Sequence, residues 1–182
     1  FPLPGNADPG RFARAALSTI LGGNMSSRLF QEVREKRGLA YAVFSYASQY
    51  VDDGQVGIYV GTRPDNVGEA LETIGSELRR ISADGVTSAE LERARENVKG
   101  RTTLSNESTL ARMNRLGSAV LMGVPVLTLD EVLARLDAVT LDDVAALAAE
   151  LYDPERLSAA GIGGSEDSFR AALAPVSEAL AA

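Results

Sequence analysis

The sequence contains no cysteine, no histidine and no tryptophan. Without cysteine there is no disulfide framework, and the redox compartment of the protein stays open. Without histidine or cysteine, the usual zinc sites, a Ser-His-Asp triad and an imidazole general base are all excluded. Chemistry that needs those groups must therefore come from a different polypeptide region.

Long apolar runs and an excess of positive charge are also missing. No stretch approaches the ~18 uninterrupted apolar residues that a membrane span needs, and no basic region followed by an apolar run marks a signal peptide. The 25 acidic residues outnumber the 18 basic ones, which gives a formal net charge of −7 and makes a phosphate backbone an unfavourable partner. We therefore expect no membrane and no nucleic acid as partners, and a cytoplasmic location.

What is present favours one globular domain over residues 1–182, because 182 residues with 45% hydrophobic content can bury a real core. Periodicity and helix breakers predict a loop over 1–8, then helices over 9–21 and from Ser26 or Ser27 to Gly38. Two strands follow over 39–51 and 55–62. The rest is mostly helical, with helices over 62–85 and 87–105, from about 107 to about 122, after 128, after 140, over 165–173 and over 175–181, and with one buried strand over 157–163. This order predicts an α+β fold in which helices cover one face of a small, mostly antiparallel sheet.

Three of the helix starts carry the residue pattern of a capping box. Thr87 and Glu90 fit it, as do Thr128 and Glu131, and Thr140 begins a similar run with aspartate in place of glutamate. We expect helices to begin directly after each threonine.

The segment 26–41 is a basic island on an acidic protein, with four basic residues against two acidic ones. Glu32 and Lys36 are spaced to pair on a helix surface. Arg34, taken alone, suits the negative end of the helix dipole. Alternation along the strand places Tyr41 on the face opposite Phe44, yet the turn at Gly38 can return Tyr41 close to Arg34. A guanidinium and a phenol on one lip suit the binding of a peptide carbonyl or of an oxyanion.

The run GGNMSSRLFQEVREKRGLAYAV, followed by a hairpin with DDG and VGIYVGT, resembles the C-terminal, non-zinc-binding domain of the pitrilysin/insulinase family of zinc metallopeptidases. The processing-peptidase-like branch, widespread in bacteria, is the nearest in pattern. The resemblance extends from about residue 10 to residue 163. In that family an arginine and a tyrosine seven positions apart reach into the peptidase chamber, and here the spacing falls on Arg34 and Tyr41.

The resemblance implies that Arg34 binds substrate carbonyls and that Tyr41 helps to hold the substrate or the tetrahedral intermediate. It also implies that zinc is bound by an H-x-x-E-H motif on a partner domain of similar fold, in the same chain or in another subunit. This chain itself is expected to bind no metal and to show no activity alone. Family domains open with a strand before the helix at 9–21, so we expect that strand to be missing by truncation or to lie on a separate segment.

Two other function classes stay open on the sequence. The same family includes non-catalytic scaffold subunits of respiratory complexes, and a module that holds extended peptides without cutting them would have the same features. A half of a two-part enzyme exposes the apolar surface that meets its partner, so we expect a homo- or heterodimer.

Overall fold

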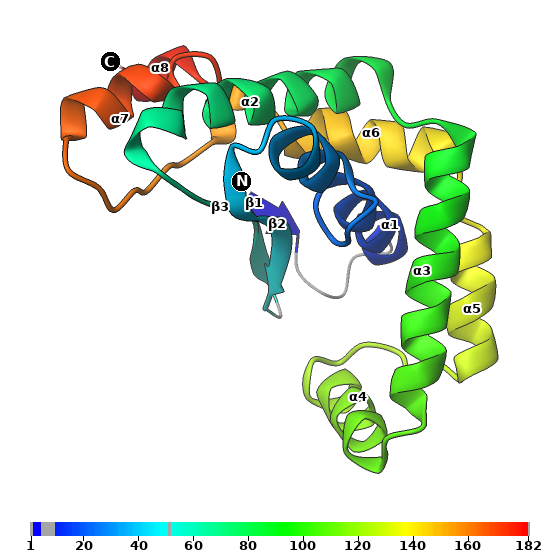
Figure 1. The fold of residues 1–182 in the computed structure, drawn as a ribbon. Helices are drawn as coiled ribbons and strands as arrows, with labels where there is room; N and C mark the ends of the chain where they lie inside the picture. The colour runs from blue at the N-terminus through cyan, green and yellow to red at the C-terminus, as the bar shows by residue number, and fades with distance from the viewer. Residues whose placement is uncertain (1, 5–9, 51, 182) are drawn as a thin grey trace.

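The computed structural model describes residues 2–4, 10–50 and 52–181 (Figure 1). The strands are β1 (Pro2–Pro4), β2 (Ala40–Gln49) and β3 (Asp53–Thr62). The α-helices are α1 (Arg11–Leu21), α2 (Val67–Asp84), α3 (Ser88–Asn106), α4 (Thr109–Leu121), α5 (Leu129–Asp137), α6 (Leu141–Leu151), α7 (Glu166–Leu173) and α8 (Glu178–Ala181). Three short helical elements complete the order: the π-helix η1 (Phe30–Glu35) and the 3₁₀ helices η2 (Pro64–Asn66) and η3 (Pro154–Arg156).

The sheet has three strands in the order β1–β3–β2, and both pairs are antiparallel. Strands β2 and β3 form the predicted hairpin, while β1 pairs only with residues 53–55 at the start of β3. On one face of the hairpin Val43 and Val56 are buried, and on the other face Phe44 and Tyr59 are exposed. The sheet therefore has one inner face that meets the core and one outer face that carries aromatic side chains.

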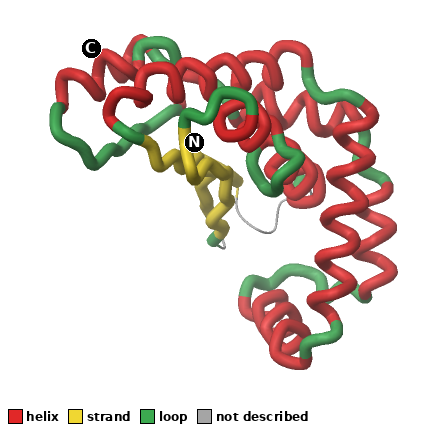
Figure 2. The backbone as a smooth tube through the Cα atoms, in the orientation of Figure 1, coloured by secondary structure: helices red, strands yellow, loops and turns green. Residues whose placement is uncertain are grey.

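Helices make up most of the molecule and surround the small sheet on its buried side (Figure 2). Helix α1 contacts β2 as well as α3, α5 and α6, and α2 contacts β3, α6 and α7. Side chains without solvent contact, or nearly so, come from α1, the segment around η1, α2 and α6: Leu17, Leu21, Leu29, Val33, Ile81, Val144 and Leu151. The arrangement is the α+β layout that the sequence predicts.

All three predicted capping boxes are confirmed. The side chains of Thr87, Thr128 and Thr140 each accept a hydrogen bond from the backbone N–H three residues later, and the acidic side chain at that position accepts one from the threonine N–H. Helices α3, α5 and α6 begin directly after these threonines, because each cap satisfies donors that a helix N-terminus leaves open.

Two expectations about the strands are wrong. The loop predicted over 1–8 contains β1, a three-residue edge strand that precedes α1; its two prolines are tolerated because an edge strand leaves one row of N–H groups unpaired. The apolar run 157–163, predicted as a buried strand, belongs to no helix or strand, and Ile162 is fully exposed. A strand needs a neighbour to pair its backbone, and none of the described strands pairs with this segment.

Helix α4 stands apart from the sheet and contacts α3 near the lower end of that long helix (Figure 1). None of its residues is buried, and Leu110, Met113 and Val120 expose more than half of their surface. The described part of the chain thus presents apolar side chains to solvent at this helix.

Candidate functional site

Arg34 is carried by η1, a single π-helical stretch whose inner side chains are buried. Leu29 and Val33 have no solvent contact, so they fix the segment against the core. Phe30 and Arg34, four residues apart, lie together on the outer side, where the guanidinium carbon is 4.8 Å from the centre of the Phe30 ring. The helix itself therefore supplies one aromatic surface for the arginine.

A tight turn after η1 reverses the chain. Gly38 adopts a φ of +62°, a conformation that favours glycine. Its N–H donates to the Arg34 carbonyl at 3.1 Å, and the Leu39 N–H donates to the Val33 carbonyl at 2.9 Å. These two bonds close the end of the helical segment and start β2 beside the helix that carries Arg34.

Tyr41 is brought to Arg34 by a β-bulge at the start of β2. Ala40 pairs with Thr62 and Ala42 pairs with Gly61, so Tyr41 is an extra residue without a partner on β3. The bulge breaks the strict alternation that would turn Tyr41 to the inner face. The Tyr41 side chain is instead 85% exposed, which corrects the face expected from the sequence.

The Arg34 guanidinium carbon lies 5.1 Å from the centre of the Tyr41 ring, so the cation contacts two aromatic rings at once. The side chain keeps 38% of its surface exposed, and its Nε forms a long surface ion pair with a carboxylate oxygen of Glu35 at 3.6 Å. Within the described residues the guanidinium donates no hydrogen bond. Ring contacts engage a guanidinium through its face and leave the N–H groups at its edge free to bind acceptors.

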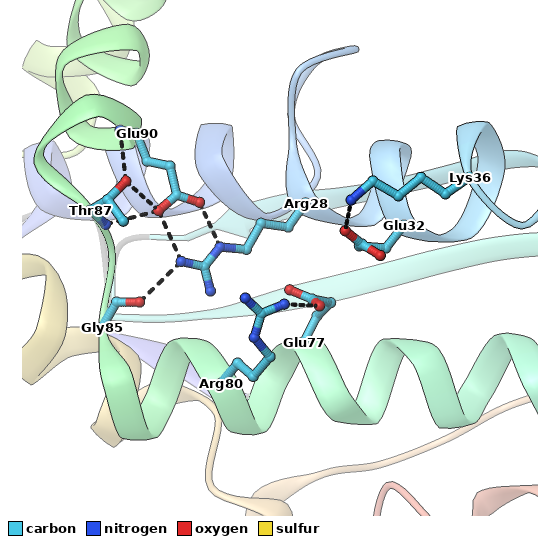
Figure 3. A network of polar contacts seen from close by, with 8 residues as sticks. All are labelled: Arg28, Glu32, Lys36, Glu77, Arg80, Gly85, Thr87 and Glu90. Carbon is cyan, nitrogen blue, oxygen red and sulfur yellow. Dashed lines mark hydrogen bonds and ion pairs between the residues drawn. The ribbon is translucent and has the colours of Figure 1, made fainter.

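The two cations that follow Arg34 in the sequence, Lys36 and Arg37, both form hydrogen bonds with the Glu32 carboxylate. Glu32 accepts hydrogen bonds from Lys36 at 2.5 Å and from Arg37 at 2.6 Å (Figure 3 draws the first). These bonds, first that of Lys36 and then that of Arg37, lower the pKa of Glu32. The predicted pairing of Glu32 with Lys36 is thereby confirmed, whereas Arg34 donates no hydrogen bond to any described residue and has only the longer ion pair with Glu35.

The segment before η1 is anchored by a polar network around Arg28 (Figure 3). The Arg28 guanidinium donates to both carboxylate oxygens of Glu90, at 2.7 and 2.9 Å, and to the Gly85 carbonyl at 3.1 Å. Glu90 also accepts hydrogen bonds from Thr87. Burial alone would raise the pKa of Glu90, but the bonds from Arg28 and Thr87 outweigh it and lower the pKa to about 2. The network ties the site to the turn between α2 and α3.

A shallow groove of about 480 Å³ adjoins the pair, between the Gly38 turn and the end of β3. Tyr41, Gly61 and Arg63 are among the residues that line it. The Thr62 hydroxyl and the Asn66 amide both donate to the Leu39 carbonyl, which holds the two sides of the groove together. Arg63 is exposed, and no ion pair joins it to another described residue.

The structure brings together the two residues that the sequence singles out and adds Phe30, which sequence reasoning missed. The spacing of Phe30 and Arg34, four residues apart before the Gly38 turn, is the signal that could have found it. The described residues hold no cluster of three or more acidic, histidine or cysteine side chains that could bind a metal ion. Over the same residues, no helix is both long and apolar enough to cross a membrane.

Comparisons with known proteins identify the class. The family model described as the peptidase M16 inactive domain matches residues 1–98. An uncharacterized zinc protease of Streptomyces coelicolor is 45% identical over 167 residues, which cover 91% of this chain and 36% of the relative. The crystal structure of a peptidase M16 inactive domain from Pseudomonas fluorescens matches with a TM-score of 0.75 at 26% identity, covering 84% of this chain and 37% of that chain.

The fold also matches a chain of Complex III2 from Candida albicans with Inz-5 bound, with a TM-score of 0.72 at 20% identity over 81% of this chain and 37% of that chain. At that identity the likeness shows the fold alone. The fold and the zinc-protease relatives thus define a domain of the metallopeptidase class.

The chain belongs to the peptidase M16 family, and the part matched is the family's inactive domain. The resemblance found in the sequence is thereby confirmed. The chain spans about a third of the length of the curated relatives it matches.

Proposed function

We propose that this chain is the substrate-binding half of a zinc metalloendopeptidase that degrades or processes peptides in a closed chamber. The zinc belongs to a partner half, in the same polypeptide or in another subunit, and supplies the activated water there. The observation that carries the proposal is the Arg34 guanidinium, which contacts the Phe30 and Tyr41 rings and, among the described residues, has a long ion pair with Glu35 but donates no hydrogen bond.

The chemistry of the pair fits a peptide in the act of being cut. A guanidinium presents several donors in a rigid plane, so Arg34 can bind the backbone carbonyl of an extended peptide. The Tyr41 hydroxyl can donate to the oxygen that gains charge in the tetrahedral intermediate. Neither residue can replace a metal-bound water, so the chain contributes binding and stabilisation of the intermediate, and the partner contributes the nucleophile.

The mutational test uses the chain joined to its zinc-bearing half and measures peptide turnover. Arg34→Ala and Tyr41→Phe should each lower kcat by about 10²–10³-fold, the loss typical of a removed oxyanion donor. Tyr41→Phe keeps the aromatic ring over Arg34, so its effect isolates the hydroxyl.

Matched controls are Tyr50→Phe and Arg170→Ala, which change an exposed tyrosine and an exposed arginine outside the site. Both should cut peptides at the unsubstituted rate. Full turnover by both site variants would remove the proposed role and favour the scaffold reading. Normal peptide binding without any cleavage by the joined protein would favour a peptide-holding module.

The partner and the location are part of the same proposal. We expect a zinc-bearing half of the same family to associate with this chain in a dimer or a two-domain polypeptide, in the cytoplasm. Sedimentation of the mixed halves measures the association. Discovery that neither the parent gene nor its neighbour encodes an H-x-x-E-H motif would count against it.

A further inference from the structure

The outer face of the β2–β3 hairpin carries a set of aromatic rings that the proposed role of Arg34 and Tyr41 does not use. Phe44, Tyr46 and Tyr59 expose 44%, 42% and 50% of their surface. Four of the five tyrosines of the chain lie on this hairpin, and aromatic residues form only 5% of the sequence. Aromatic side chains are therefore concentrated on this hairpin, and Phe44, Tyr46 and Tyr59 are exposed on its outer face.

The rings form one continuous surface, which we call the aromatic face (Phe44, Tyr46 and Tyr59). Phe44 and Tyr59 are direct partners across the strands, and their rings are stacked with centres 5.1 Å apart. Tyr46 follows with its ring centre 6.2 Å from that of Phe44.

Two glycines make room for these rings. Tyr46 pairs with Gly57, where a Cβ would come within 2.3 Å of the tyrosine ring. A Cβ on Gly61 would come within 3.2 Å of the Tyr59 hydroxyl. The rings thus lie across the neighbouring strand positions, and each presents a broad surface to solvent.

The aromatic face leads directly to the Arg34–Tyr41 site. Gly61, over which Tyr59 leans, lines the groove that Tyr41 and Arg63 also line. A peptide that reaches the Arg34–Tyr41 site can therefore lie along the hairpin without leaving the protein surface.

The two ends of the hairpin carry charges of opposite sign. Asp52 and Asp53, both exposed, stand at the tip of the hairpin. Arg34 and Arg63 stand at the opposite end, beside the groove. An occupant with an acidic group toward the arginines and a basic group toward the tip complements both ends.

From this arrangement we infer that the aromatic face selects extended peptides with an aromatic side chain stacked on the Phe44–Tyr59 pair and an acidic group directed at Arg63. The inference rests on the proposed function, since it takes the occupant to be the peptide that Arg34 binds, and it adds the substrate class. Aromatic residues suit such a role because they give a large contact area at a small cost in conformational freedom.

The test measures binding without cleavage, using the protein with its zinc-bearing half after the metal has been removed with a chelator. Three fluorescent peptides of equal length serve as probes. The first has a central phenylalanine and a glutamate four residues away on either side, because Tyr59 and Arg63 are four residues apart and side chains that far apart in an extended peptide share a face. The second has alanine in place of the phenylalanine, and the third has lysine in place of each glutamate. The first should bind about tenfold more tightly than the second, as one aromatic contact predicts, and severalfold more tightly than the third.

Variants of the protein show which of its residues cause the preference for phenylalanine and for glutamate. Phe44→Thr combined with Tyr59→Thr should remove the difference between the phenylalanine and alanine peptides, whereas Tyr59→Phe, which keeps the ring, should retain it. Arg63→Ala should remove the preference for glutamate over lysine. Tyr50→Thr, which alters an exposed tyrosine beyond the stack, is the matched control and should leave every ratio unchanged.

Equal affinity of the unsubstituted protein for the phenylalanine and alanine peptides would overturn the inference without any variant. It would also be overturned if the double variant lost its zinc-bearing half in sedimentation, because the aromatic face would then be an interface between proteins. Arg34→Ala separates the two proposals. If this variant keeps full turnover while the unsubstituted protein keeps its peptide preferences, the proposed function alone is wrong. If the variant loses turnover as expected while the unsubstituted protein binds the phenylalanine and alanine peptides equally, this inference alone is wrong.

Discussion

Arg34 is positioned by two aromatic neighbours that come from different elements. Phe30 lies on the same helical segment, and Tyr41 lies on the strand that follows. A long flexible side chain loses freedom when it binds a substrate. Contacts that already restrict the guanidinium before binding reduce that loss, so under the proposed function the two rings hold the arginine in place for its acceptor.

Phe30→Leu is expected to lower kcat/KM for peptide cleavage by about 2–5-fold in the joined protein, because one exposed cation–π contact contributes about 0.5–1 kcal/mol. Steady-state kinetics measure the change, and urea unfolding monitors stability, which should change little at this partly exposed position. Phe12→Leu, at a second ring that contacts an arginine, is the control and should leave kinetics unchanged. A loss as large as that of Arg34→Ala would show that Phe30 does more than orient the guanidinium.

Glu90 makes the stability of the fold depend on pH. Its pKa of about 2 in the folded protein lies below the ordinary value of 4.5. The stabilisation is therefore complete above about pH 4.5 and is lost as the pH falls toward 2. Because solvent screens this partly exposed pair, we expect a loss of about 1–2 kcal/mol in the free energy of unfolding.

Urea unfolding between pH 6 and pH 2 measures this loss against Glu90→Gln, which should lack it. Glu131→Gln provides a matched capping-box control, since Glu131 is hydrogen-bonded by Thr128 but by no arginine. Glu131→Gln should keep more of the loss in the free energy of unfolding between pH 6 and pH 2 than Glu90→Gln does. Equal curves for Glu90→Gln and the unsubstituted protein would contradict the argument.

At the scale of elements, local signals in the sequence were sufficient for the helix starts and insufficient for strand pairing. The capping boxes at Thr87, Thr128 and Thr140 involve residues three positions apart, so the sequence contains the whole interaction. The run 157–163 has the composition of a strand, but pairing depends on a distant neighbour that composition does not encode. The same limit hid the bond between Arg28 and Glu90, which are 62 residues apart.

The candidate site was predictable for a similar reason. Arg34 and Tyr41 are separated by one helix end and one glycine turn, both of which the sequence marks. The bulge that turns Tyr41 outward could not be foreseen, because its position depends on the register between β2 and β3. The aromatic face likewise required the register, which sets Phe44 opposite Tyr59.

The contact between the end of α1 and β2 depends on a glycine without a side chain. A Cβ on Gly22 would lie 2.4 Å from the Ser45 backbone nitrogen, whose N–H donates to the Gly22 carbonyl. Gly22→Ala should therefore lower the free energy of unfolding by about 1–3 kcal/mol through forced displacement of β2. Gly100→Ala, in the middle of α3 with open space around it, should instead raise it by about 0.5–1 kcal/mol.

Urea unfolding of both variants under one condition provides the comparison, and circular dichroism checks that each one folds. Because the two substitutions add the same methyl group, the sign of the change isolates the surroundings of each glycine. A Gly22→Ala protein as stable as Gly100→Ala would mean that α1 and β2 separate without cost.

At the scale of the whole molecule, the proposed function assigns the binding of a peptide to this chain and its cleavage to a partner half. It offers a guanidinium, phenols and an aromatic face, but the sequence has neither histidine nor cysteine. Metal-dependent peptide hydrolysis uses an activated water, which a zinc site generates with ligands that are commonly histidine or cysteine. Under the proposed function, catalysis by the complete protein depends on contact between the two halves.

This division of roles predicts that the chain alone, supplied with zinc, cleaves no peptide at a rate above that of zinc in buffer. Addition of the zinc-bearing half should produce cleavage that rises with the concentration of this chain and then saturates, because turnover requires the complex. A chain with Arg34→Ala should saturate at a similar concentration but at a far lower rate, since the substitution affects the reacting peptide and not the association. Zinc-dependent cleavage by the chain alone, insensitive to Arg34→Ala, would mean that the metal and the substrate site lie in one half after all.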